Sequence, residues 1–211
     1  MYYRFSNRAQ RAVFSRNAPR HYDGRMAVHD ERSDIELVAV CNTGGPKDAA
    51  AAFETLYRRH RDYVLRVARR FARDRELALD ALQETFTYLL KKFPPAGPGL
   101  VLTARMQTLL YPVAKHCAIS ALRRADCRGN DDVLPDELPA EPAAEHVPLD
   151  AALANLSPER REVVTLRFVD DLSLEDIAIA LEIPLGTVKS RLHLAIKQLR
   201  EDPRIKDLFA P

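Results

Sequence analysis

The side chains best suited to specific chemistry lie in one short stretch near the carboxyl end of the chain. They are hydroxyl, imidazole, ammonium and guanidinium groups, which donate hydrogen bonds or carry positive charge. The set comprises Thr187, Lys189, Ser190, Arg191, His193 and Lys197. Such groups bind the phosphates and the base edges of DNA. The chemistry that they suggest is nucleic-acid binding, provided that one element presents them together.

A helix would present these donors together. Apolar side chains recur through the same stretch at a period near 3.6, which predicts a helix with one buried face. The predicted buried stripe consists of Val188, Leu192, Ala195, Ile196 and Leu199. Ser190, His193 and Lys197 lie opposite that stripe, and the other three donors flank them. One outer helix face would therefore carry all six groups.

A shorter helix is predicted directly before this one. Ser173, followed three residues later by Asp176, is typical of a capping box, so the helix begins there. The residues on its apolar stripe are Leu174, Ile177, Ala178 and Leu181. Pro184 ends it and marks a turn over Glu182–Pro184. Two helices joined by such a turn predict a helix-turn-helix whose second helix enters the major groove. A helical hairpin with an ordinary solvated face fits the periodicity equally well.

A ridge of polar side chains is predicted on an earlier helix, expected over about residues 76–93. Its members stand at i, i+3, i+4 and i+7, and so share one side of the helix. They are Asp80, Gln83, Glu84 and Thr87. Paired carboxylates could serve acid–base chemistry, but no metal cluster, nucleophile or phosphate loop accompanies them in the sequence. A protein-docking ridge is the better interpretation. The apolar residues expected to be buried on this helix are Leu79, Leu82, Phe86, Leu89, Leu90 and Phe93.

A further group of cations follows a proline- and glycine-rich loop, on a helix expected from about Leu102 to Arg124. Lys115, Arg123 and Arg124 could contact phosphates, although each fits a solvated face equally well. Pro112 stands inside the same pattern. Since an interior proline costs about 3 kcal/mol, we expect a new helix to begin there or the helix to kink.

Composition bounds the function classes. The formal charge of +2 is nearly neutral, so nucleic-acid binding must be argued from where the charges lie. The charged residues are unevenly distributed along the chain. Residues 1–32 carry seven arginines against three acids, and residues 126–150 carry eight acids against the single Arg128. Three cysteines without metal-ligand spacing predict neither a metal site nor a disulfide framework, and we expect no cofactor. No apolar run is long enough to span a membrane, so no membrane insertion is expected.

Two stretches of the sequence resemble sigma-70 family RNA polymerase sigma factors. The run from Leu153 to Arg200, which includes ALANLSPERREVVTLRFVDDLSLEDIA and PLGTVKSRLHLA, resembles the promoter-reading domain at the carboxyl end of that family. Its GTVKSRL segment is especially close to the extracytoplasmic-function group. The run LALDALQETFTYLLKKF resembles the family's second conserved region. The resemblance covers roughly four-fifths of the chain, whereas a helix-turn-helix alone would match over about twenty residues.

The resemblance implies roles for particular residues. Asp80, Gln83 and Glu84 match positions that grip the clamp helices of the polymerase beta-prime subunit. Lys189, Ser190 and His193 match base-facing and groove-facing positions that read the minus-35 element. Thr187 and Arg191 are expected phosphate contacts. Leu194 departs from the family, which commonly has arginine there.

The helix that would read the minus-10 element matches less well. The segment LLYPVAKHCAISALRR is similar to that helix, and its expected DNA contacts are Leu109, Lys115, His116, Ser120, Arg123 and Arg124. Leu109, His116 and Ser120 stand where the family favours tryptophan, asparagine and aspartate. Pro112 is a further departure. Minus-10 preference and promoter melting are the properties that these differences affect.

The expected fold class is all-α, with two small helical domains joined by a flexible acidic linker. The expected segments are a basic, disordered amino-terminal arm (1–32), a sigma region 2-like domain (33–124), an acidic proline-containing linker (125–148), a sigma region 4-like helix-turn-helix domain (149–203) and a tail (204–211). The region between the domains could span at most roughly 80 Å, enough to separate two DNA-reading domains by two helical turns of about 35 Å.

The resemblance implies an alternative sigma factor that directs promoter recognition and is not itself an enzyme. Its implied partners are core RNA polymerase, through the beta-prime clamp helices and the beta flap, promoter DNA and an anti-sigma factor, and its expected location is the cytoplasm. Two alternatives remain open. One is a degenerate sigma mimic that sequesters an anti-sigma factor, and the other is a helix-turn-helix regulator that does not dock on polymerase.

Overall fold

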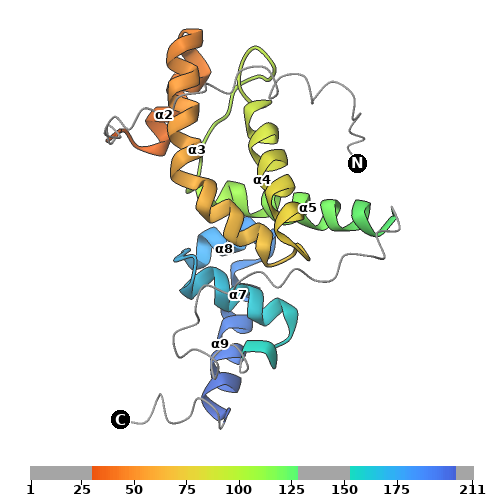
Figure 1. The fold of residues 1–211 in the computed structure, drawn as a ribbon. Helices are drawn as coiled ribbons and strands as arrows, with labels where there is room; N and C mark the ends of the chain where they lie inside the picture. The colour runs from red at the N-terminus through yellow and green to blue at the C-terminus, as the bar shows by residue number, and fades with distance from the viewer. Residues whose placement is uncertain (1–29, 128–152, 203–211) are drawn as a thin grey trace. The chain divides into compact units, whose positions relative to one another are not determined.

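The computed structural model describes residues 30–127 and 153–202 (Figure 1). Within these residues the fold consists of seven helices without a strand, which confirms the predicted fold class. The helices are α2 (Asp34–Thr43), α3 (Pro46–Arg69), α4 (Arg75–Leu90), α5 (Met106–Cys127), α7 (Pro158–Phe168), α8 (Leu174–Leu181) and α9 (Leu185–Glu201). The predicted arm, linker and tail lie largely outside the described residues. In the part that is described, no helix is both long and apolar enough to cross a membrane.

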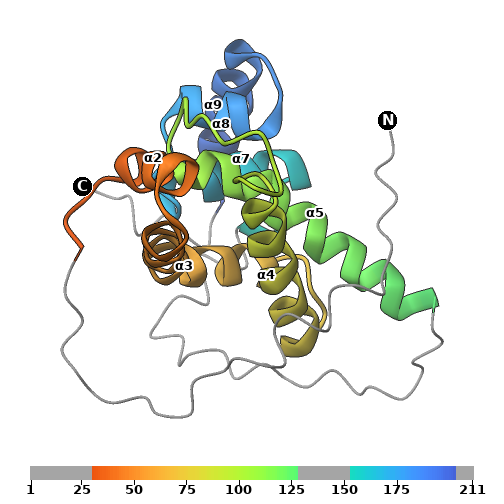
Figure 2. The same cartoon turned by 90° about the horizontal axis from the view of Figure 1, so that it is seen from above.

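α2 and α3 form a pair of helices fixed at one end by polar contacts (Figure 2). The Ser33 hydroxyl accepts a hydrogen bond from the Glu36 N–H, and the Glu36 carboxylate accepts one from the Ser33 N–H at 2.6 Å, so both halves of a capping box begin α2. The Asp34 carboxylate contacts Arg59 at 2.5 Å and the buried His60 ring at 2.8 Å. Burial alone would raise the pKa of Asp34, but the bonds and charges of His60 and Arg59 hold it below its ordinary value. This carboxylate therefore links the two helices in its ionised form.

α4 packs against α3 and α5 through smaller side chains than the sequence predicts. Ala78 and Ala81 are fully buried, and they form an apolar cluster with Ala68 of α3 and Ala118 of α5. The predicted burial of Leu79 and Leu90 was wrong, since these side chains are 38% and 45% exposed. Small residues allow helix axes to approach closely, so the alanine stripe faces the neighbouring helices and those leucines turn to the surface. The remaining residues predicted to be buried, Leu82, Phe86, Leu89 and Phe93, are buried.

α5 runs without interruption from Met106 to Cys127 and contains Pro112. Of the two outcomes expected at Pro112, a new helix is ruled out, because α5 is continuous through the proline, and α5 begins four residues later than predicted. Proline cannot donate to the carbonyl of Thr108, one turn earlier. Leu110, Tyr111 and Ala114, which surround the proline in sequence, are each at most 1% exposed. Tertiary burial therefore compensates for the interior proline.

One apolar cluster connects α2–α5 with α7–α9. Buried residues of the early helices, such as Leu110 and Tyr111 of α5, belong to the same cluster as Leu166 of α7 and Ile177 of α8. α5 and α8 are in direct contact. The described helices lie within one compact unit and share this core. The arrangement places α9 beyond α8, with one face buried against α7 and α8.

Candidate nucleic-acid interface

The outer face of α9 carries the predicted donors. Lys189, Ser190, His193 and Lys197 are exposed, while Thr187 and Arg191 are half-buried at the margins of the same face. The Ser190 hydroxyl donates to the Thr187 carbonyl at 3.0 Å, which holds it close to the helix. The structure therefore brings together all six residues that the sequence singled out on this helix.

α9 packs against its neighbours through its apolar side, which leaves the side with the donors exposed. Val188 and Ala195 are fully buried, and Leu192 and Leu199 pack partly against the apolar clusters. Of the predicted buried stripe of α9, Val188 and Ala195 are therefore buried, and Leu192, Ile196 and Leu199 are half-buried. The turn before α9 is made by Glu182, whose φ of 54° lies in the left-handed region and ends α8. The two helices and their turn have the order and lengths of a helix-turn-helix.

The start of α8 confirms half of the predicted capping box. The Asp176 N–H donates to the Ser173 hydroxyl at 3.0 Å. The Asp176 carboxylate accepts from the Ser173 hydroxyl at 2.8 Å and from the Thr108 hydroxyl of α5 at 2.9 Å. Burial would raise the pKa of Asp176, but these bonds lower it below its ordinary value. This carboxylate therefore both caps α8 and links it to α5. Before α7, by contrast, Ser157 occupies the cap position without a side-chain cap bond.

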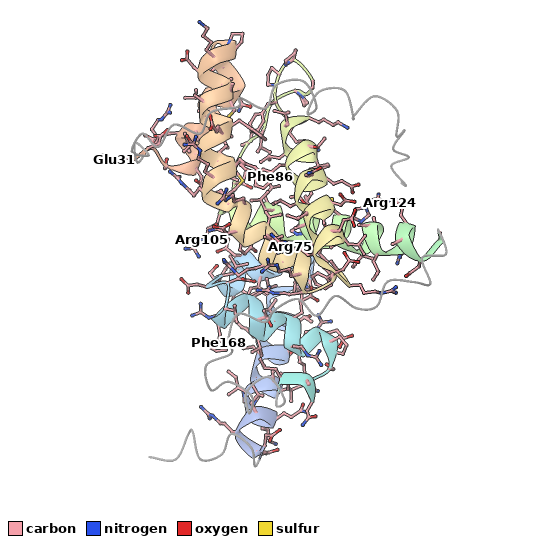
Figure 3. All side chains as sticks on the ribbon, viewed as in Figure 1. Glu31, Arg75, Phe86, Arg105, Arg124 and Phe168 are labelled. Carbon is pink, nitrogen blue, oxygen red and sulfur yellow. The ribbon has the colours of Figure 1, made fainter. Side chains whose placement is uncertain are left out.

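The polar ridge of α4 lies at the surface, as predicted. Asp80 and Gln83 are exposed, and Glu84 and Thr87 are half-buried beside them. Glu84 accepts a hydrogen bond from Arg124 of α5 at 2.6 Å, and Arg124 lies next to α4 in Figure 3. A predicted polymerase contact is thus paired with a predicted DNA contact.

The six predicted DNA contacts of α5 do not form one free face. Leu109 packs partly against the apolar core, and Lys115 is bonded to Glu162 of α7. His116 and Arg123 are exposed, and Ser120 lies 3.5 Å from the His116 ring. Because Arg124 is also paired with Glu84, the six residues have different neighbours and do not act as one surface. α5 touches α3, α4 and α8, whereas most residues of its last turn are exposed.

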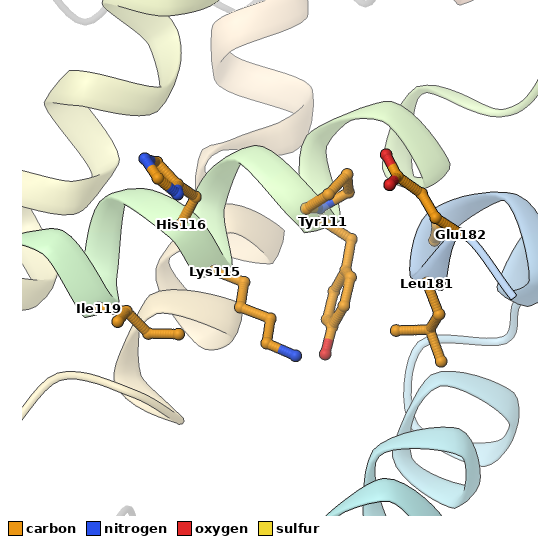
Figure 4. Close-up of a pocket in the computed structure, with 8 residues that line it drawn as sticks. Tyr111, Lys115, His116, Ile119, Leu181 and Glu182 are labelled. Atoms are coloured by element: carbon orange, nitrogen blue, oxygen red, sulfur yellow. The ribbon is translucent and has the colours of Figure 1, made fainter. Parts of the chain in front are cut away.

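A hollow of about 320 Å³ lies between α5 and α8 (Figure 4). Lys115, His116 and Ile119 line it from α5, and Leu181 and Glu182 line it from the opposite side. Tyr111 points from α5 in the same direction as Lys115 (Figure 4). Sequence patterns predicted no role for Tyr111 or for Glu162 of α7, which accepts a hydrogen bond from the Tyr111 hydroxyl. No local pattern marks a contact between segments that lie so far apart along the chain.

The described residues show no candidate metal centre and no reactive buried thiol. Among them, no three His, Cys, Asp or Glu side chains are grouped so as to hold a metal ion. Cys41 and Cys117 are buried, and burial raises the pKa of Cys117 to about 11, so it is a neutral thiol at physiological pH.

Two family models match the chain. The model described as "Sigma-70 region 2" matches residues 56–127, which end with α5, and the model described as "Sigma-70, region 4" matches residues 146–199, which contain α7, α8 and most of α9. The first match falls on the helices that carry the polar ridge of α4. The second falls on the helices that carry the donors on the outer face of α9.

Similar proteins point to the same family. The chain is 31% identical over 175 residues to the ECF RNA polymerase sigma factor SigE of Mycolicibacterium smegmatis, a match that covers 77% of this chain and 66% of that relative. It is 33% identical over 174 residues to the RNA polymerase sigma-E factor of Streptomyces coelicolor, covering 75% and 89%. A solved structure of similar fold is the sigma factor RpoE in complex with the anti-sigma factor NepR from Bartonella quintana, with a TM-score of 0.55 and 22% identity over 73% of this chain and 96% of that one. The chain therefore belongs to the sigma-70 family of RNA polymerase sigma factors, in its extracytoplasmic-function group.

Proposed function

We propose that this chain is an alternative sigma factor that binds core RNA polymerase and directs it to promoters. The observation that carries the proposal is the exposed donor face of α9 on a helix-turn-helix, within a chain of this family. A regulator of this kind acts by binding and positioning, and we assign it no catalytic activity of its own. Its place of action would be the cytoplasm, where the polymerase transcribes.

We assign contact with the upstream promoter element, the minus-35 element, to α9. Lys189, Ser190 and His193 would face the base edges of the minus-35 element, because these exposed donors project from the side opposite the buried stripe. Thr187 and Arg191 at the margins of the face, and Lys197 one turn further on, would contact phosphates. These contacts would fix both the register and the sequence preference of the second domain.

We assign core polymerase binding to the ridge of α4. Asp80, Gln83, Glu84 and Thr87 would contact the beta-prime clamp helices, and the helix-turn-helix domain would contact the beta flap. An anti-sigma factor is a further proposed partner, since the similar sigma factor RpoE was solved with one. The minus-10 contacts of α5 would be Leu109, Lys115, His116, Ser120, Arg123 and Arg124, once those that are paired in the described structure are released.

Capture of the chain on immobilised core polymerase tests the polymerase assignment. The variant with Asp80→Lys and Glu84→Lys should bind at least about tenfold more weakly than the wild type, because complementary charges at the interface become repulsive. A matched reversal of two exposed acids on α3, Asp62→Lys with Glu54→Lys, should bind normally. Glu84→Lys also breaks the bond between Glu84 and Arg124. Arg124→Ala breaks that bond while leaving Glu84 in place, and this variant should bind polymerase normally. Equal capture of all variants would contradict the assignment.

A sigma mimic that sequesters an anti-sigma factor remains the second candidate. The observation that favours it is α5, where Leu109 packs toward the core and Lys115 is bonded to Glu162. A mimic would bind an anti-sigma factor but would neither be captured by core polymerase nor direct it to DNA. The same capture experiment distinguishes the two functions.

A further inference from the structure

The Ser190 hydroxyl on the outer face of α9 is bonded back to its own helix. Its Oγ atom lies 3.0 Å from the carbonyl oxygen of Thr187, almost one turn earlier. A carbonyl oxygen has lone pairs but no proton, so the direction of this bond is fixed and the serine proton points at the helix backbone. The second lone pair of the same carbonyl remains available for the helical hydrogen bond from the Arg191 N–H.

This bond decides what Ser190 offers to a binding partner. A serine hydroxyl has one proton and two lone pairs, so in general it can either donate or accept a hydrogen bond. Serine in a helix often donates to a carbonyl of the preceding turn, as Ser190 does. Its side chain is exposed, and the part of the hydroxyl that faces outward is therefore an acceptor. To donate to DNA, the hydroxyl would first lose the backbone bond, which disfavours that state by roughly 2- to 13-fold.

The cations around Ser190 have the opposite property. Lys189, Arg191 and Lys197 carry protons on their side-chain nitrogens and have no acceptor to offer. In the major groove such groups bind acceptors, above all O6 and N7 of guanine. The ring of His193 has one donor and one acceptor when it is neutral. Ser190 therefore adds a fixed acceptor to a helix face whose cations only donate.

An acceptor in the major groove distinguishes between bases. Adenine and cytosine present amino groups there, at N6 and N4, whereas guanine and thymine present the oxygen acceptors O6 and O4. Two acceptors that face each other without a proton between them both stay unsatisfied, which costs binding free energy. A freely rotating serine hydroxyl would fit either kind of base. A hydroxyl whose proton is already used should select a base with an amino group.

We propose that Ser190 is a specificity-determining residue that accepts a hydrogen bond from the amino group of an adenine or a cytosine in the upstream promoter element. The inference rests on the proposed function and adds a chemical requirement at one base. Thr187 is a positioning residue in this account, because its backbone carbonyl holds the serine proton. The upstream element should therefore contain adenine or cytosine where Ser190 faces it.

Binding of the assembled holoenzyme to modified duplexes tests this assignment. The probe is a promoter duplex selected by the holoenzyme from random-sequence templates. Each adenine or cytosine of its upstream element is replaced in turn by N6-methyladenine or N4-methylcytosine, in which a methyl group replaces the amino proton that faces the major groove. At one position this change should weaken binding by wild-type protein roughly fivefold or more. Ser190→Ala should bind the unmodified duplex about as weakly, and the same methylation should change its affinity by less than about twofold.

A second set of duplexes tests the opposite direction of the bond. 7-Deazapurines lack the N7 acceptor, and 6-thioguanine and 4-thiothymine have sulfur, a weaker acceptor, in place of oxygen. A position where these bases weaken wild-type binding but not Ser190→Ala binding would mean that the hydroxyl donates, and would overturn the proposal. Lys189 shows that the method detects a donor. At the base that faces Lys189, 7-deazaguanine should weaken binding by both wild type and Ser190→Ala, but not by Lys189→Ala.

Matched variants separate base reading from effects on the fold. Ser190 carries no charge, so Ser190→Ala should leave the slope of log affinity against log salt unchanged. Ser190→Thr keeps a hydroxyl that can bond back to the helix, and it should keep the preference for the unmodified amino group. Thr43→Ala removes a hydroxyl bonded in a similar way, to the Ala39 carbonyl at 3.0 Å, but on α2. This control should bind every duplex as the wild type does, and all variants should show native helix content by circular dichroism.

The outcomes separate this inference from the proposed function. If the holoenzyme binds its selected promoter but Ser190→Ala changes the response to no methylated adenine or cytosine, the assignment of Ser190 is overturned and the proposed function stands. If the holoenzyme selects no duplex at all, the proposed function fails and the assignment fails with it.

Discussion

The two helices expected to read DNA, α9 and α5, differ in how much of their surface the fold leaves free. α9 packs through one stripe against α7 and α8, and its opposite face exposes donors along three turns. α5 packs against α3, α4 and α8, and its predicted DNA contacts are divided between core, ion pairs and surface. A helix packed on one side can display a recognition face continuously. A helix packed on several sides can do so only after a neighbour leaves.

The first prediction tests the free helix and has the largest expected effect. Replacing Lys189 and Arg191 by alanine should weaken duplex binding by roughly 10- to 100-fold at low salt, because two cations are lost. The slope of log affinity against log salt should flatten by up to about two units. Titrations at several salt concentrations measure both quantities, with Lys47→Ala, an exposed cation on α3, as the control. An unchanged slope would contradict phosphate contact by α9.

The second prediction concerns the packed helix. Pro112→Ala should stabilise the chain by about 2 kcal/mol, since it restores a helical N–H at the cost of a more flexible unfolded chain. Urea unfolding followed by circular dichroism measures the change. Leu109→Trp provides the contrast: Leu109 packs against the apolar core, and a larger ring there should destabilise by about 1–3 kcal/mol. Lower stability of Pro112→Ala would mean that the proline itself is required by its surroundings.

The third prediction tests the bond between the two helix groups at Asp176. The pKa of this carboxylate is lowered in the folded chain, so its contribution is present above the unfolded value near 3.8 and is lost as the pH falls through the folded value. Asp176→Asn should therefore cost about 1 kcal/mol at neutral pH, through the cap of α8 and the bond to Thr108. Below the folded pKa the two proteins should be equally stable. A difference that persists at low pH would rule out the charged form as the cause.

The smallest prediction sharpens the view of α9 as a base-reading helix. Leu194 is 43% exposed, next to Ser190 and His193, where the family commonly has arginine. An apolar side chain in this place can contact a thymine methyl group. Replacing one thymine of the upstream element by uracil should cost about 0.8 kcal/mol, the value of one methyl group. The loss should vanish in Leu194→Ala. If no thymine-to-uracil change affects binding, Leu194 reads no methyl group.

The helix-turn-helix could be predicted from sequence because its signals are local. The stripe from Val188 to Leu199, the start at Ser173 and the turn before Leu185 are all periodicity, capping and proline effects within a few residues. The polar ridge from Asp80 to Thr87 could be predicted for the same reason. In each case the apolar residues predict which side of the helix is buried, and the polar residues on the other side then form the exposed surface.

The remainder depends on contacts that no local pattern encodes. Leu79 and Leu90 were expected to be buried because leucine usually is, but the alanines of α4 made the closer contact. Pro112 was expected to end or kink a helix, and burial around it compensated. Arg70 and Asp170 lie 100 residues apart, so their pairing appears only in the folded chain.

Run-off transcription with purified core polymerase tests the central claim most directly. The template should be a promoter selected with the assembled holoenzyme. We expect a discrete transcript that requires this chain and that is lost with Lys189→Ala and Arg191→Ala, while capture on polymerase persists. A chain that is captured by polymerase but yields no transcript from any selected template would contradict the account.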